Sequence, residues 1–86
     1  MTDENIYMVN LPAEMRPIKI YEYKHDAADE ERREILLMPN KDDGQWQYIN
    51  MTKGYICPCK FPTREDALKD FAKYVKKFRR VEFEEL

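Results

Sequence analysis

The sequence predicts a small α+β domain, in which an antiparallel meander of three to four strands packs on one C-terminal amphipathic helix. Two observations support this fold class. Short apolar, β-prone runs at 33–38, 46–51 and 55–61 are separated by turn-rich segments that contain Gly44 and Gly54. A capped pattern of helical period then begins after Pro62. At 86 residues, the chain is expected to form a single domain over 1–86.

The meander is predicted to span 17–61 and to begin with a strand at 17–24, where β-branched and aromatic residues are dense. Residues 1–15 carry scattered apolar groups and are interpreted as an arm or an edge strand. Segment 26–32 is ambiguous, because Asp26 and Asp29 imitate a helix-capping pair but no apolar residue follows at helical spacing until Ile35. We therefore expect a charged loop or a single turn there.

The helix is predicted over 64–79, with Thr63 as its N-cap and Asp66 three residues later. An apolar stripe of helical period should be buried against the sheet. Its main members are Leu68, Phe71, Val75 and Phe78. Residues 81–86 alternate apolar and acidic side chains, which is typical of a short edge strand or a tail.

The net charge of −2 is unevenly distributed, since residues 64–80 hold seven bases and three acids. On a continuous helix, five of these bases share the side opposite the apolar stripe: Lys69, Lys73, Lys76, Lys77 and Arg80. This basic face is either an anion-binding surface for nucleic acid or an acidic partner, or an ordinary solvated face with cations that complement the helix dipole.

Both faces of the second hairpin carry large side chains, with an excess of aromatic surface. Trp46 and Tyr48 point to one side of their strand, and Tyr55 begins the next strand. These aromatics either form an association surface or fill a small core. Short chains bury little surface and leave strand edges unpaired, so we expect a homodimer formed by edge pairing or through the Trp46, Tyr48 and Tyr55 face.

No catalytic, cofactor or metal motif is found in the sequence. Cys57 and Cys59 are predicted to be free, buried thiols, because a metal site needs about four ligands and His25 is the sole histidine. The spacing does not match a redox pair. The N-terminus lacks a basic signal-peptide region and no apolar run could span a membrane, so a cytoplasmic protein without cofactors is expected.

Segment 44–67 resembles the three-strand-plus-helix domains of the AP2 and integrase arm-binding type, which share a Gly-x-Trp strand and a Phe-x-Thr-x-x-x-Ala helix entry. Here these are Gly44-Gln45-Trp46 and Phe61-Pro62-Thr63-Arg64-Glu65-Asp66-Ala67. The resemblance implies DNA reading by basic residues on the sheet. This sheet departs from that pattern and offers mainly Gln45, Gln47, Asn50, Lys53 and Lys60, so no family is assigned.

These observations favour a small non-enzymatic protein-interaction or regulatory module that acts through surface complementarity. Its partner is expected to be another protein of unknown identity, and the chain is also expected to associate with a second copy of itself. The alternative is a nucleic-acid-binding protein that uses the basic helix face and the polar sheet surface.

Overall fold

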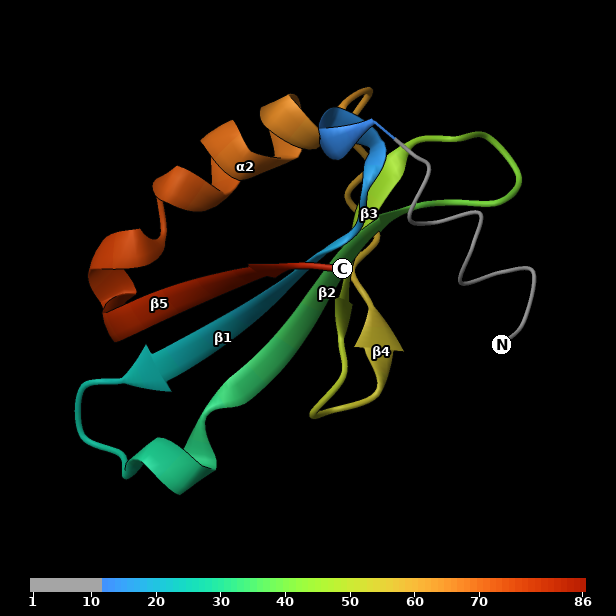
Figure 1. Ribbon diagram of the computed structural model, residues 1–86. Helices are drawn as coiled ribbons and strands as arrows, with labels where there is room; N and C mark the ends of the chain where they lie inside the picture. The colour runs from blue at the N-terminus through green and yellow to red at the C-terminus, as the bar shows by residue number, and fades with distance from the viewer. Residues whose placement is uncertain (1–11) are drawn as a thin grey trace.

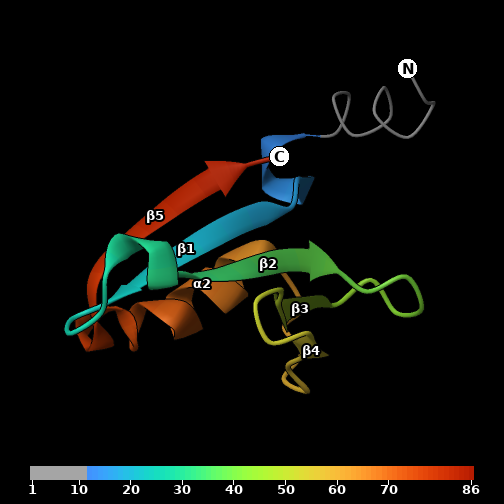
Figure 2. The ribbon, with the colours of Figure 1, turned by 90° about the horizontal axis from the view of Figure 1, so that it is seen from below.

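The computed structural model describes residues 12–86, which form a five-stranded antiparallel sheet with one α-helix on one side (Figures 1 and 2). The strands are β1 (Ile18–Lys24), β2 (Arg33–Pro39), β3 (Trp46–Asn50), β4 (Tyr55–Ile56) and β5 (Phe78–Glu85). The helix is α2 (Arg64–Ala72), and the 3₁₀ turns are η1 (Ala13–Met15), η2 (Asp29–Glu31) and η3 (Val75–Lys77). The predicted α+β class, an antiparallel sheet with one helix, is confirmed.

The spatial order of the strands is β4-β3-β2-β1-β5, and every neighbouring pair is antiparallel. The first four strands form the predicted meander, although β4 is much shorter than the expected 55–61. The chain then crosses the sheet through α2 and η3 and returns as β5 beside β1 (Figure 1). The prediction of three to four strands with a terminal helix was therefore incomplete, because a fifth strand follows the helix.

Alternation along the strands places one set of side chains under α2. Ile18 and Ile20 of β1 face Leu37 and Ile35 of β2, and all four are buried. Trp46, Ala67 and Phe71 complete this core. The helix begins where predicted, because the Thr63 hydroxyl accepts a hydrogen bond from the Asp66 N–H at 3.1 Å.

The opposite face of the sheet carries a layer of aromatic and charged side chains. The Tyr23 hydroxyl donates to Glu82 at 2.7 Å and accepts from Arg32 at 3.0 Å. The Arg80 guanidinium lies 4.0 Å from the centre of the Tyr23 ring, a cation–π geometry. We call this surface the open face, since α2 packs on the other side of the sheet.

The helix predicted over 64–79 was too long. α2 ends at Ala72, where the Lys73 N–H bonds to the carbonyls of Asp70 and Phe71, and η3 then leads into β5. Pairing of 78–85 with β1 competes with helix continuation and wins, because it supplies a long ladder of backbone hydrogen bonds. As a result Phe71 is buried as predicted, Leu68 and Phe78 are half-buried, and Val75 is exposed, contrary to the prediction.

Segment 26–32 forms a turn that contains the short 3₁₀ helix η2 and no α-helix, as predicted. The alternating end of the chain is an edge strand, which is longer than the predicted 81–86. Of the segment interpreted as an arm or edge strand, 12–15 contains η1, and 1–11 lies outside the described residues.

Candidate functional site

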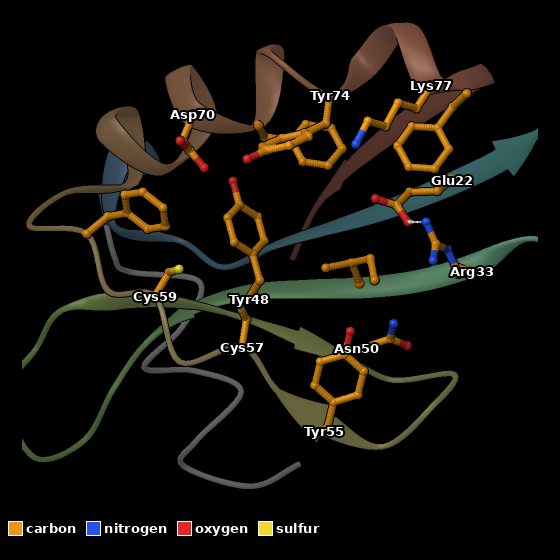
Figure 3. Close-up of a pocket in the computed structure, with 14 residues that line it drawn as sticks. Glu22, Arg33, Tyr48, Asn50, Tyr55, Cys57, Cys59, Asp70, Tyr74 and Lys77 are labelled. Atoms are coloured by element: carbon orange, nitrogen blue, oxygen red, sulfur yellow. Dashed lines mark ion pairs between the residues drawn. The ribbon is translucent and has the colours of Figure 1, made fainter.

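A groove of about 340 Å³ lies between the α2–η3 segment and the face of the sheet under the helix (Figure 3). It forms because α2 is short and the chain turns away toward β5 after Ala72. The helix side contributes Asp70, Tyr74 and Lys77 to its lining, and the sheet contributes residues from all five strands. The groove is therefore built by segments that are distant in sequence.

One end of the groove has aromatic walls. The ring of Tyr48 lies 6.0 Å from that of Phe61, edge to face, and 6.0 Å from that of Phe71. The Tyr48 hydroxyl donates to the Ala67 carbonyl of α2 at 2.6 Å. Burial raises the pKa of Tyr48, so this hydroxyl stays neutral and connects the sheet to the helix.

The other end of the groove holds an ion pair between neighbouring strands. Glu22, only 6% exposed, lies opposite Arg33, and a carboxylate oxygen is 3.0 Å from a terminal guanidinium nitrogen (Figure 3). Burial raises the pKa of Glu22, although the charge of Arg33 opposes this shift. The buried Nε of Arg33 has no hydrogen-bond partner among the described residues. The pair thus gives this end of the groove a carboxylate and a guanidinium.

The two cysteines lie along the groove near β4. Both are free thiols; Cys57 is half-buried and Cys59 is exposed, so the prediction of two buried thiols was wrong for Cys59. The reason is that β4 ends at Ile56 and Pro58 cannot continue its ladder. A hydrogen bond with Cys57 raises the pKa of Cys59, which disfavours the nucleophilic thiolate. Within 12–86, His, Cys, Asp and Glu residues form no cluster of metal-binding size.

The predicted aromatic surface is divided between core and groove. Trp46 is 3% exposed and belongs to the core, so it offers no contact surface to a partner. Trp46 pairs with Pro39 of β2, two residues after the buried Leu37, so its side chain lies on the same face of the sheet as Leu37, under α2. It also bridges to Phe61. Tyr48 lines the groove with its hydroxyl already engaged, and Tyr55 lines the groove while remaining exposed.

The predicted basic face does not exist as one helical stripe, because the helix ends too early. Lys69 lies in α2, and Lys73 at its C-cap approaches Asp70 at 3.7 Å. Lys76 and Lys77 belong to η3, where Lys77 lines the groove. Arg80 lies in β5 on the open face, within ion-pair distance of acidic side chains; these are Asp29 and Glu82.

The sequence interpretation missed the charged end of the groove. Glu22 continues the alternation of Ile18 and Ile20, so an acid on the apolar side of a strand was a readable signal. Arg33 could not be assigned in the same way, because its role depends on the register between β1 and β2. No local pattern assigned a role to Asp70, which lines the groove from α2.

No helix among residues 12–86 combines the length and the hydrophobicity that crossing a bilayer requires. No protein-family model, no curated protein and no solved structure matches the chain, so its function is inferred from the geometry of the groove.

Proposed function

We propose that this chain is a small, non-enzymatic protein-interaction module whose groove receives an apolar side chain from a segment of a partner protein. The observation that supports this most directly is the combination of aromatic walls with one buried charged end in an open groove. Protein recognition commonly depends on an anchoring side chain that enters such a depression, with polar groups fixing its orientation.

The chemistry of the lining favours a protein segment as the ligand. Its aromatic surface would be removed from water by an apolar side chain. Glu22 and Arg33, which line the same groove, would orient the segment through its polar backbone groups. The four charged groups in the lining, Glu22, Arg33, Asp70 and Lys77, sum to zero, so a strongly charged ligand is not favoured.

The alternative function, nucleic-acid binding, loses its main geometric support. The cations expected to share one helix face are distributed over α2, its C-cap, η3 and β5. Arg80 in addition lies among acidic side chains on the open face. The free thiols Cys57 and Cys59 support a reducing, cytosolic setting for the proposed module.

The test is to select peptides from a random display library on the immobilised full chain and to measure the binding of a labelled selected peptide by fluorescence anisotropy. Tyr55→Ala and Tyr74→Ala each remove an exposed aromatic from the groove and should weaken binding by roughly tenfold. Met51→Ala is the matched control, since Met51 is similarly exposed but does not line the groove, and it should leave affinity unchanged.

The proposal is wrong if no peptide is selected, or if the selected peptides bind the two groove variants and the control with equal affinity. A parallel titration with duplex and single-stranded nucleic acid tests the alternative. Tight binding that weakens steeply with added salt would favour it over the peptide groove.

A further inference from the structure

The outer strand β5 has a free backbone edge among the described residues. It pairs with β1 on one side and is the last strand of the sheet on the other. The Leu86 N–H donates to the Pro17 carbonyl at 3.1 Å, so the backbone groups of Leu86 point toward β1. Glu84 and Glu82, two and four residues earlier in the same register, direct their N–H and C=O groups toward β1 as well. The N–H and C=O groups of Val81, Phe83 and Glu85 therefore point away from β1.

The side chains along this edge alternate between apolar and charged. Val81 and Phe83 lie on the face under α2, where the Phe83 ring contacts that of Phe71 but remains 53% exposed. Arg80, Glu82 and Glu84 lie on the open face. An eight-residue edge with free backbone groups and an exposed aromatic is a surface that proteins normally cover.

We propose that β5 pairs antiparallel with β5 of a second copy of the chain. The two-fold axis passes between the two copies of Glu82, perpendicular to the sheet. In this register Val81 lies opposite Phe83 of the partner subunit, and Arg80 lies opposite Glu84 of the partner subunit. The symmetry repeats both pairs. The two sheets join into one, with two apolar pairs on the helix face and two ion pairs on the open face.

The hydrogen-bond phase, the charges and the contact between Val81 and Phe83 together select this register. A shift by one residue would place outward-pointing backbone groups opposite inward-pointing ones and reverse the faces. A shift by two in one direction would put Glu82 opposite Glu84 of the partner subunit twice, a repulsive arrangement. A shift by two in the other direction would still place Arg80 opposite a carboxylate, Glu82 of the partner subunit, but it would replace the two contacts between Val81 and Phe83 by one contact between the two copies of Val81.

The proposed axis brings two copies of Glu82 together, and the existing contacts compensate this charge. Each Glu82 accepts a hydrogen bond from the Tyr23 hydroxyl at 2.7 Å and lies 3.7 Å from the Arg80 guanidinium. The opposite edge of the sheet is formed by β4, which has two residues and is too short to support comparable pairing. The dimer goes beyond the groove function, because Val81, Phe83, Arg80 and Glu84 do not line the groove.

The test is sedimentation analysis of the full chain from micromolar to near-millimolar concentration, with charge-exchange variants. Glu84→Arg should weaken the dimer by roughly tenfold, because it places two cations opposite each other at both symmetric positions. Arg80→Glu should do the same with two carboxylates. An equimolar mixture of these two variants should form a heterodimer, since only then does each position 80 face an opposite charge at position 84.

Lys69→Glu is the matched control, since it changes charge on α2 away from β5 and should leave the dimer intact. Circular dichroism checks that each variant is folded. Val81→Pro removes an outward N–H from the edge strand without changing charge, and it should also dissociate the dimer. A monomer at all concentrations, or a dimer that the Glu84→Arg and Val81→Pro variants both retain, would overturn the proposal.

Discussion

The Tyr48 hydroxyl in β3 donates a 2.6 Å hydrogen bond to the Ala67 carbonyl in α2, so the same side chain lines the groove and fixes the helix above the sheet. Tyr48 is held between Phe61 and Phe71, which limits its freedom to find another acceptor. This contact makes the shape of the groove dependent on the position of the helix.

Replacing Tyr48 by Phe should therefore lower the free energy of unfolding by about 1 kcal/mol, the typical net contribution of one neutral hydrogen bond. Urea unfolding followed by far-UV circular dichroism measures this change. Tyr55→Phe is the matched control, because Tyr55 is exposed and removal of its hydroxyl should change stability by less than about 0.5 kcal/mol. Equal effects of the two substitutions would show that the contact with Ala67 contributes no stability.

The Glu22–Arg33 pair predicts an unusual pH dependence. Because burial raises the folded-state pKa of Glu22 above 4.5, the folded protein binds this proton more tightly than the unfolded chain does. The contribution of Glu22 to stability should therefore decrease as pH rises from 4.5 through the folded-state pKa. Urea unfolding at a series of pH values measures the free energy of unfolding of the native chain and of the Glu22→Gln variant. The value for the native chain minus that for the variant should decrease over that range.

Glu34→Gln supplies a control of opposite sign. The hydrogen bond with Lys19 lowers the pKa of Glu34, so the stability that Glu34 provides is present above pH 4.5 and is lost as pH falls through its folded-state pKa. The difference between the native chain and this variant should grow with rising pH. If both differences change in the same direction, the assignment of the Glu22 effect to burial is wrong.

The turn between β3 and β4 depends on a left-handed residue. Gly54 has φ of +76°, and a Cβ built there meets no atom within 4 Å, so a substitution would be strained without a clash. Gly54→Ala should lower stability by roughly 1 kcal/mol. Gly54→Asn should lower it less, since Asn adopts this conformation more readily. Thermal or urea unfolding of both variants checks the order, and a larger loss for Asn would contradict it.

Local signals made much of the fold predictable. The dense β-branched and aromatic residues of 17–24, the apolar run of 33–38, the turn glycines and the Thr63 cap each act over a few residues, and each was found in its predicted place. The end of the helix was not predictable in this way. Residues 73–80 fit both an amphipathic helix and a strand, and pairing between β5 and β1, which are distant in sequence, decides between them.

The candidate site was less predictable because it depends on that same long-range choice. The basic face required a helix that reached Arg80, and the early end of α2 distributed its cations over several elements. The groove itself is the space that the short helix leaves uncovered. Tyr48 and Tyr55, predicted as parts of an association surface, do line the groove, and Glu22, an acid on the apolar side of a strand, carried a further local signal of the site.

Arg79 connects β5 to the loop between β1 and β2. A bulge in the pairing near Tyr23 leaves Arg79 without a partner in the β1 ladder, and its guanidinium forms an ion pair with Asp29. It also donates to the carbonyls of Lys24 and Ala27, at 3.4 and 3.5 Å. One planar side chain therefore holds three points of the loop.

Replacing Arg79 by Lys should release the loop while keeping the positive charge, because an ammonium group on a flexible stem does not reproduce the forked contacts. Hydrogen exchange measured by mass spectrometry should become faster for backbone amides at 25–31 and stay unchanged for β2 and β3. Lys53→Ala, at an exposed position in the turn after β3, is the control that should leave exchange in 25–31 unaltered. Unchanged exchange in the Arg79 variant would mean that η2 and the flanking strands order this loop without it.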